Sequence, residues 1–265
     1  MLPIARKAKI KEIILEKKNV TVAELTKLFN LTEETIRRDL KQLEEEGFLT
    51  RIYGGAYIND GVQNDVNVNL REHIHVEGKK KIAEKCVEFI RPGDSIFLDA
   101  STTSLYIAKL LHNKRITVVT NSLKIVNALI ENENVRLVMI GGVMSHGSMS
   151  ALGRSAEQSI NSYYFDLAFV SCRSVSRQHG ITDSNEQQAE VRRLAIERAN
   201  RVYLVADITK FDRTSFASIC GFDKIDTLVV DKPLDDEWRE FLRQKGVQLV
   251  ECEANAEPKA EAKTE

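Results

Sequence analysis

The 265-residue sequence predicts an α/β protein with two domains: a small, mainly helical N-terminal domain and a larger domain built on a doubly wound, mostly parallel sheet. Two observations predict this architecture. Apolar residues recur at helical spacing through residues 10–43, and a Gly-Gly turn between apolar residues follows at 54–55. From residue 95 onward, short continuous apolar runs alternate with amphipathic segments, which is typical of parallel strands joined by helices.

The composition is that of an ordinary soluble protein, with an apolar fraction of 43% and a charged fraction of 29%. The sequence contains no apolar run of about 18 residues that could span a membrane, and its N-terminus lacks the apolar core of a signal peptide. We therefore expect a cytoplasmic protein. The net charge of −1 says little about nucleic acid, because residues 1–58 hold 11 Lys and Arg against 9 Asp and Glu.

The segment from residue 31 to residue 49 predicts a helix with two different faces. Ile36, Leu40 and Leu43 lie on one apolar stripe, and Thr32 is a suitable N-cap. A short helix with a buried stripe and a basic outer face fits the major groove of DNA, although an ordinary surface helix can show the same pattern. The residues that we predict to point away from the stripe or to flank it are Glu34, Thr35, Arg37, Arg38 and Lys41.

A shorter helix and a tight turn precede this helix. Residues 21–28 predict the helix, and Phe29-Asn30-Leu31 predict a turn in which Asn30 takes the left-handed conformation. Together with a first helix at residues 6–18, this indicates a helix-turn-helix over about residues 20–39. Residues 48–58 then predict a β-hairpin, or wing.

The strings TIRRDL and LEEEGFLTRIYGGA resemble the N-terminal motif of the DeoR-type family of bacterial transcription regulators. The resemblance implies that residues 1–58 form a winged helix-turn-helix domain and that its partner is a double-stranded DNA operator. The candidate DNA-binding residues are Thr21, Thr32, Glu34, Thr35, Arg37, Arg38, Lys41, Arg51, Tyr53, Gly54 and Gly55.

The larger domain is predicted at residues 71–252, after a polar linker at 59–70, and residues 253–265 predict a disordered tail. Residues 71–90 predict one helix, with Lys79 to Lys81 on a solvated face. The strands are predicted at 95–99, 116–120, 135–140, 168–170, 202–206, 227–230 and 247–250, and the further helices at 103–111, 122–131, 155–162, 187–199 and 235–244.

Polar and small residues follow five consecutive strands of the larger domain, where ligands bind in open α/β sheets. Small hydroxyl residues at a helix N-terminus can hold an anion, and glycine permits close backbone approach. Each residue alone could be an N-cap or a turn residue, but five strand ends together predict a site. The candidates are Asp99, Ser101, Thr102, Thr103, Asn121, Ser122, Gly142, Arg173, Asp183 and Lys210.

The order DASTT, TNS, GG, GIT and AD-x-x-KF is similar to the sensor domain of the same family, whose fold resembles sugar-phosphate isomerases. The resemblance implies that a phosphorylated sugar or related anionic metabolite is the effector. The sequence departs from the family at Ala100, where Gly is usual, and at residues 171–175, where a Gly-containing stretch is usual. Arg173 then either adds a phosphate ligand or fills the pocket and excludes the usual effector.

Three functions remain open at this point. The first is a DNA-binding transcription regulator, expected to repress a carbohydrate-metabolism operon and to release its operator when the effector binds. The second is a sugar-phosphate isomerase fused to a DNA-binding module, since Asp99, Asp183, Glu190 and Asp207 could each act as a general base. The third is a nucleic-acid-binding protein whose second domain is purely structural.

We expect the first function, without enzyme activity and without a cofactor. A homodimer or homotetramer is expected, because helix-turn-helix proteins usually pair on two-fold operators. We expect no metal site, because the four cysteines lack zinc-ligand spacing and His73 and His75 have no clustered Cys or carboxylate nearby.

Overall fold

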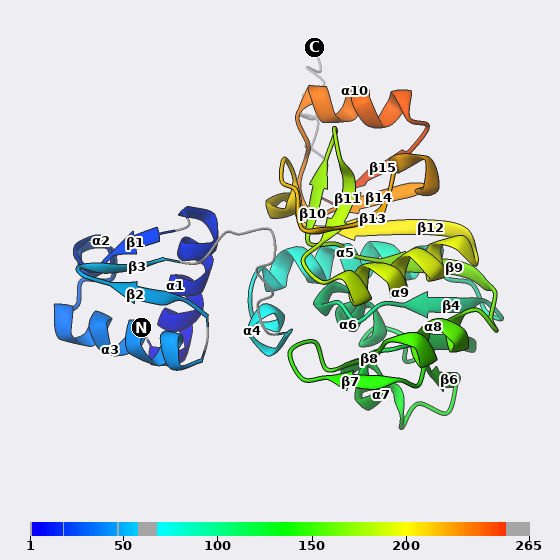
Figure 1. The fold of residues 1–265 in the computed structure, drawn as a ribbon, viewed down its shortest axis with the longest axis horizontal. Coiled ribbons are helices and arrows are strands. Elements are labelled where there is room, and N and C mark those ends of the chain that lie inside the picture. Colours follow the sequence, from blue (N-terminus) through cyan, green and yellow to red (C-terminus); the bar gives the residue numbers. More distant parts are fainter. Residues whose placement is uncertain (1, 18, 47, 58–67, 253–265) are drawn as a thin grey trace, which may run out of the picture.

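The computed structural model describes residues 2–17, 19–46, 48–57 and 68–252, arranged as a small N-terminal domain and a larger α/β domain (Figure 1). Most of the predicted linker and the whole predicted tail lie outside these residues. Within the described ranges, no helix is both long enough and apolar enough to cross a lipid bilayer.

The N-terminal domain contains three helices and a three-stranded antiparallel sheet, so the predicted helix-turn-helix and wing are confirmed. The strand order is β1-β3-β2, and β1 was not predicted from the sequence. The elements are α1 (Pro3–Lys17), β1 (Asn19–Thr21), α2 (Val22–Phe29), α3 (Glu33–Glu45), β2 (Thr50–Ile52) and β3 (Gly55–Tyr57).

Local sequence signals set the ends of the helix-turn-helix. Asn30 ends α2 in the left-handed conformation with a φ of 52°, as predicted, and Thr32 caps α3 by accepting a hydrogen bond from Thr35 N. Leu40 and Leu43 are buried on the inner face of α3 in the domain's core. The predicted phase of this helix is therefore correct.

The larger domain is built on a seven-stranded sheet in the order β15-β14-β12-β9-β4-β5-β6, in which every pair of neighbours is parallel. The strand order reverses between β4 and β9, so the topological switch point lies there. The seven strands are β4 (Ser95–Leu98), β5 (Ile116–Thr120), β6 (Val135–Met139), β9 (Phe165–Val170), β12 (Ala199–Ala206), β14 (Thr227–Val230) and β15 (Gln248–Glu251).

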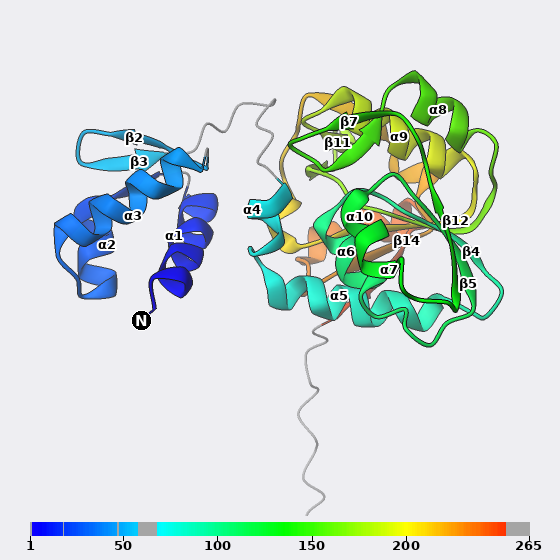
Figure 2. The same cartoon turned by 90° about the horizontal axis from the view of Figure 1, so that it is seen from below.

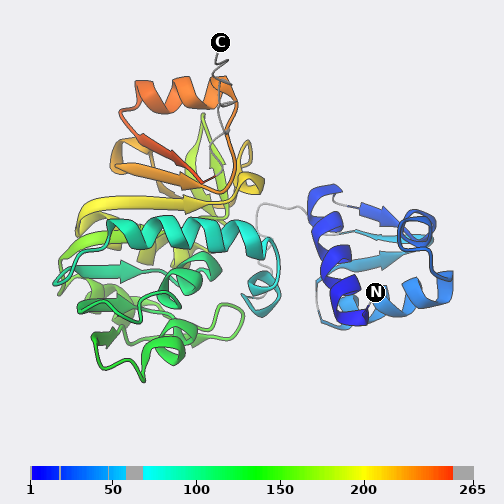
Figure 3. The same ribbon diagram turned by 180° about the vertical axis from the view of Figure 1, so that it is seen from behind.

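Helices cover both faces of this sheet, which confirms the doubly wound prediction (Figure 3). Each face has its own apolar core, because the central parallel strands are buried on both sides. One face is covered by α5 (Val76–Phe89), α6 (Thr102–Ala108) and α7 (Leu123–Leu129), and the other by α8 (Arg154–Ile160), α9 (Glu186–Glu197) and α10 (Asp236–Gln244).

Three features of the larger domain differ from prediction. The helix predicted at 71–90 is two helices, α4 (Val68–Glu72) and α5, separated at His75, whose φ of 51° is left-handed. Lys79, predicted on a solvated face, is buried. Two small antiparallel sheets were missed, namely the hairpin of β7 (Val143–Ser145) and β8 (Ser150–Leu152), and the sheet of β10 (Ser174–Ser176), β11 (Gly180–Asp183) and β13 (Ala217–Cys220).

Candidate functional site

The outer face of α3 is exposed and carries three cations, Arg37, Arg38 and Lys41, among three carboxylates. Arg38 is exposed and makes no ion pair with any residue that the structure describes. Arg37 pairs with Glu33 at 2.9 Å, and Lys41 lies 3.8 Å from Glu45, both at the i,i+4 spacing of a helix surface. These surface pairs are weak, so the cations remain available to a polyanion.

The wing presents one aromatic side chain at its turn. Tyr53 is fully exposed, and Gly54 follows it with a left-handed φ of 82°. The Arg51 side chain is bound to α3, because its Nε donates to Glu44 Oε2 at 2.7 Å. Gly55 is buried, and a Cβ there would lie 2.2 Å from the Val20 carbonyl oxygen. The structure therefore gives Gly55 a packing role, in contrast to its predicted place on the DNA surface.

The two threonines among the predicted DNA contacts begin the helices of the motif. Thr21 and Glu24 form a capping box, and Thr32 caps α3. Both threonines are exposed, whereas Thr35 is half-buried. Their backbone and hydroxyl groups lie at the N-terminal ends of α2 and α3, where phosphate oxygens of DNA are commonly bound.

A buried ion pair that sequence analysis missed joins the first and third helices. Arg6 Nε lies 2.5 Å from Asp39 Oδ2, and Arg6 Nη2 donates to Asp39 Oδ1 at 3.1 Å. Both side chains are buried, so the bidentate pair fixes α3 against α1. Asp39 lies three residues after Ile36 and four before Leu43, both buried, and this spacing is the signal that could have revealed it.

At the switch point of the larger domain, Asp99 follows β4 and is satisfied by protein donors. Its carboxylate accepts from Ser104 Oγ at 2.6 Å, from Ser171 N at 3.0 Å and from Arg192 Nε at 2.6 Å. Burial acts to raise the pKa of Asp99, but Arg192 and the hydrogen-bond donors outweigh it and the net shift is downward. Asp99 is therefore ionised, and its hydrogen bonds join Ser104, Ser171 and Arg192.

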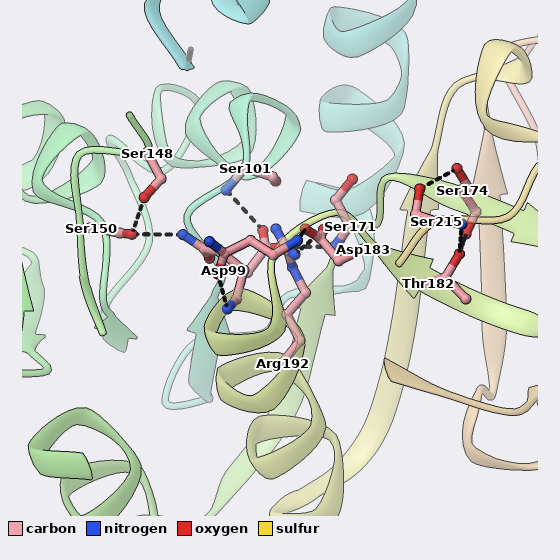
Figure 4. A network of polar contacts seen from close by, with 12 residues as sticks. Asp99, Ser101, Ser148, Ser150, Ser171, Ser174, Thr182, Asp183, Arg192 and Ser215 are labelled. Carbon is pink, nitrogen blue, oxygen red and sulfur yellow. Dashed lines mark hydrogen bonds and ion pairs between the residues drawn. The ribbon is translucent and has the colours of Figure 1, made fainter. Parts of the chain in front are cut away.

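Arg192 of α9 also binds Asp183, so two carboxylates from different strands meet one guanidinium (Figure 4). All three residues are buried. Asp99 and Asp183 were predicted to face the effector, and the structure shows both engaged with Arg192 instead. Sequence analysis missed Arg192, although it lies on the same helix face as the buried Gln188 and Ala195.

The hydroxyl residues predicted at the ends of β4 and β5 are buried, and two of them cap helices. Ser101 caps α6 through Ser104 N, and Ser122 caps α7 through Ile125 N. Thr102 and Thr103 are buried in the first turn of α6. Gly142 allows β7 and β8 to approach, because a Cβ would lie 2.6 Å from the Leu152 carbonyl oxygen.

Cations gather where β9 and β12 end. We call Lys79, Arg173 and Lys210 the cationic group. Burial lowers the pKa of Lys210; Asp207 opposes this shift, and Arg173 adds to it. Burial likewise lowers the pKa of Lys79 to about 7, with Asp207 opposing and Lys210 adding to the shift. Lys210 thus lies near both Lys79 and Arg173, with Asp207 as the opposing carboxylate, so the cations there outnumber it.

Helix α4 lies on the side of the larger domain that faces the N-terminal domain (Figure 2). Glu72 pairs with Lys109 and Lys124, and Val68 N donates to the Gly147 carbonyl oxygen in the β7–β8 turn at 2.8 Å. Ile74, just beyond α4, is buried with the apolar core of the N-terminal domain. This segment therefore contacts both domains.

Lys79 connects the cationic group to the same segment. Its Nζ donates to the carbonyl oxygens of Arg71 and Ile74. Lys79 belongs to a run of three lysines, and this run predicted a solvated face and concealed the role. In the structure Lys79 and Ala83, four residues apart, are both buried on the inner face of α5.

Family models match both domains. Residues 6–62 match the DeoR-like helix-turn-helix domain, and residues 74–232 match the DeoR C-terminal sensor domain, which is more than half of the chain. The chain belongs to the DeoR family of transcription regulators. It is accordingly a DNA-binding regulator, and the larger domain is its sensor domain.

Curated relatives extend over nearly the whole regulator. It is 37% identical to an uncharacterized HTH-type transcriptional regulator, YulB, of Bacillus subtilis, over 94% of this chain and 97% of the relative. It is 34% identical to a protein of Escherichia coli O157:H7 provisionally named the aga operon transcriptional repressor, over 92% of each chain. It is 33% identical to the L-fucose operon activator of Haemophilus influenzae, over 90% of this chain and 98% of the relative.

The alternative of an isomerase is not supported. The matched family consists of transcription regulators, and the curated relatives are named as regulators. The geometry agrees, because Asp99 and Asp183 are both bound to Arg192 and a general base must be free to accept a proton from the substrate.

Proposed function

We propose that this regulator represses a carbohydrate-metabolism operon and releases its operator when a phosphorylated sugar or related anionic metabolite binds the sensor domain. Two relatives carry names that refer to the aga and L-fucose operons, which supports a carbohydrate operon. We further propose a cytoplasmic homodimer or homotetramer, because paired helix-turn-helix domains match the two-fold symmetry of most operators. We divide the chain into residues 1–58, a linker at 59–70, a sensor domain at 71–252 and a tail at 253–265.

The DNA-binding half of the proposal depends on α3. Its outer face carries Arg38, which pairs with no described residue, between Glu34 and Lys41 and opposite the buried Leu40, and a helix with such a face fits the major groove. The wing would place Tyr53 beside the DNA backbone. The proposed contacts are Thr21, Thr32, Glu34, Thr35, Arg37, Arg38, Lys41, Arg51, Tyr53 and Gly54.

The observation that carries the effector half is the cationic group beside the switch point of the sheet. Burial lowers the pKa of both Lys79 and Lys210, and neighbouring cations add to the shift against the opposing Asp207, so an anion beside the two lysines would favour their charged forms. Arg173 lies near Lys210, so we propose that it binds the ligand. The neighbouring residues Ser101, Thr102, Thr103, Asn121 and Ser122 would complete the site.

We propose that the segment from α4 to Ile74 carries the signal between the domains. Lys79 donates to two carbonyl oxygens in this segment. An anion that draws the Lys79 ammonium toward itself would weaken those hydrogen bonds and free the segment that holds Ile74 in the N-terminal core. The operator would then be bound less tightly, since a ligand shifts an equilibrium only by its differential affinity for the two states.

The test is an operator titration. An operator is first selected from random double-stranded DNA with the full-length regulator, and binding is then measured by fluorescence anisotropy at fixed salt with a panel of phosphorylated sugars. At least one of them should weaken operator binding about tenfold or more, which is about 1.4 kcal/mol. Unphosphorylated parent sugars serve as controls. Operator binding that no phosphorylated sugar changes would contradict the proposed effector class.

A further inference from the structure

A cluster of four neutral side chains lies at the other end of the sensor site, around the hairpin of β7 and β8. Ser148 Oγ and Ser150 Oγ lie 2.7 Å apart, and Gln188 Nε2 donates to Ser150 Oγ at 2.8 Å. Asn121, directly after β5, bonds to Ala151, the residue after Ser150: its Nδ2 donates to the Ala151 carbonyl oxygen, and Ala151 N donates to the Asn121 carbonyl oxygen. All four are at most 6% exposed, and Figure 4 shows Ser148 and Ser150 side by side.

In this cluster, one polar atom of the Asn121 side chain lacks a hydrogen-bond partner among the described residues. Its Nδ2 donates to the Ala151 carbonyl oxygen at 3.1 Å, whereas its Oδ1 is buried and has no hydrogen-bond partner in the described part of the chain. Buried polar atoms are rarely left without a partner, because they lose their hydrogen bonds to water. A hydroxyl group of a ligand would supply the missing donor.

The cluster and the cationic group lie on opposite sides of the switch point. Asn121 follows β5 and Lys210 follows β12, and β4 and β9 lie between these two strands in the sheet. The two strands are thus about 14 Å apart, at roughly 4.8 Å for each neighbouring pair. A single ligand can reach both groups only if it is extended, with an anionic end toward Lys210 and an uncharged end toward Asn121.

We propose that Asn121, Ser148, Ser150 and Gln188 form a hydroxyl-recognition subsite, which binds the polyol part of the effector and determines which phosphorylated sugar the regulator senses. This inference rests on the proposed function, because it assigns the two ends of the same ligand. The cluster carries no charge, and serine hydroxyls and carboxamides can both donate and accept hydrogen bonds, as sugar hydroxyls do. The anionic end is left to the cationic group.

The subsite also lies next to the segment that contacts the N-terminal domain. Ser148 directly follows Gly147, whose carbonyl oxygen accepts from Val68 N at the start of α4. Since the four side chains are buried, a ligand can reach them only if residues around them move, and Ser148 itself lies in the turn between β7 and β8. A sugar hydroxyl bound in the subsite would therefore change the turn that holds α4.

The experiment compares Gln188→Ala with Gln187→Ala in the full-length regulator. Gln187 is the neighbouring residue on α9 and is exposed, so it is a matched control. Affinities are measured by calorimetry for inorganic phosphate, glycerol 3-phosphate, ribose 5-phosphate, glucose 6-phosphate and fructose 6-phosphate. Gln188→Ala should weaken the tightest-binding sugar phosphate about tenfold and leave inorganic phosphate unchanged, because one hydrogen bond to the sugar is lost. Gln187→Ala should match the wild type.

Ser148→Ala keeps the inference testable if Gln188→Ala does not fold, because it removes one oxygen atom and should show the same selective loss. Wild-type affinities in both variants would overturn the subsite and leave the proposed function intact. An equal loss for inorganic phosphate and for the sugar phosphate would also overturn it, because the cluster would then only support the fold. A wild-type regulator that binds none of the phosphorylated sugars would overturn both proposals.

Discussion

The two domains use their charged residues in opposite ways. On α3 of the N-terminal domain, Arg38 and Lys41 face solvent, and they are available to a large polyanion that approaches from outside. In the sensor domain, Arg192 and Lys79 face the interior, where they bind carboxylates or backbone carbonyl oxygens. The outward charges of α3 can therefore meet DNA, whereas these inward charges hold elements of the sensor domain to one another.

The largest effect is expected for Arg192→Leu, which would leave Asp99 and Asp183 buried without their shared cation. We expect the sensor domain to lose about 3–5 kcal/mol of unfolding free energy. Urea unfolding of the full-length regulator measures this loss. Arg193→Leu is the matched control, because Arg193 is the next residue and forms only surface pairs. Equal stability of the two variants would mean that the Arg192 site is not a buried charge centre.

Leu40→Ala tests the core of the N-terminal domain in the same way. Leu40 is 1% exposed, so its truncation should cost roughly 2–5 kcal/mol of unfolding free energy. Hydrogen exchange of the α3 amides measures the loss for this domain separately. Lys41→Ala, an exposed neighbour, should change little. Unchanged exchange protection in Leu40→Ala would contradict the observed helix phase.

The same contrast explains what could be predicted from the sequence. Periodicity reports which face of an element is buried, so α3 was predicted correctly, and β5 and β14 were placed with their observed bounds. Periodicity does not report which buried polar groups meet across elements, so the partners Arg192 and Lys79 were missed. The β7–β8 hairpin was missed because its strands are only three residues long and β7 is largely exposed. The helix break at His75 has no Pro or Gly to mark it.

Lys210→Ala tests the enclosed site of the sensor domain. Loss of one charged hydrogen-bond donor should weaken effector binding by roughly 1.5–3 kcal/mol. Operator affinity without effector should stay the same, because Lys210 belongs to the sensor domain. Calorimetry with the active sugar phosphate measures the first quantity, and anisotropy with operator DNA measures the second. Lys224→Ala, an exposed lysine of the same domain, should match the wild type in both.

Two outcomes for Lys210→Ala would alter the comparison between the domains. Wild-type affinity for the effector would remove Lys210 from the proposed site. Loss of operator binding in the absence of effector would show that the two domains do not divide DNA binding and sensing between them.

Arg38→Ala tests the outward-facing charges. Of the four substitutions, it should cause the smallest change in the free energy of binding or unfolding. Arg38 is exposed and unpaired among the described residues, so its removal leaves the fold intact. Specific operator binding should weaken by about 1–3 kcal/mol at one base position if Arg38 contacts a base. Anisotropy with operator variants at fixed salt measures the effect. Equal affinity for the selected operator would place Arg38 outside the contact surface.

The central claim is that effector binding in the sensor domain and operator binding by α3 oppose each other. The most direct measurement is a calorimetric titration of the active sugar phosphate into the free regulator and into the operator-bound regulator. Linkage requires that the effector bind the operator-bound form more weakly, by the same factor by which it weakens operator binding. Equal effector affinities for the two forms would contradict the claim.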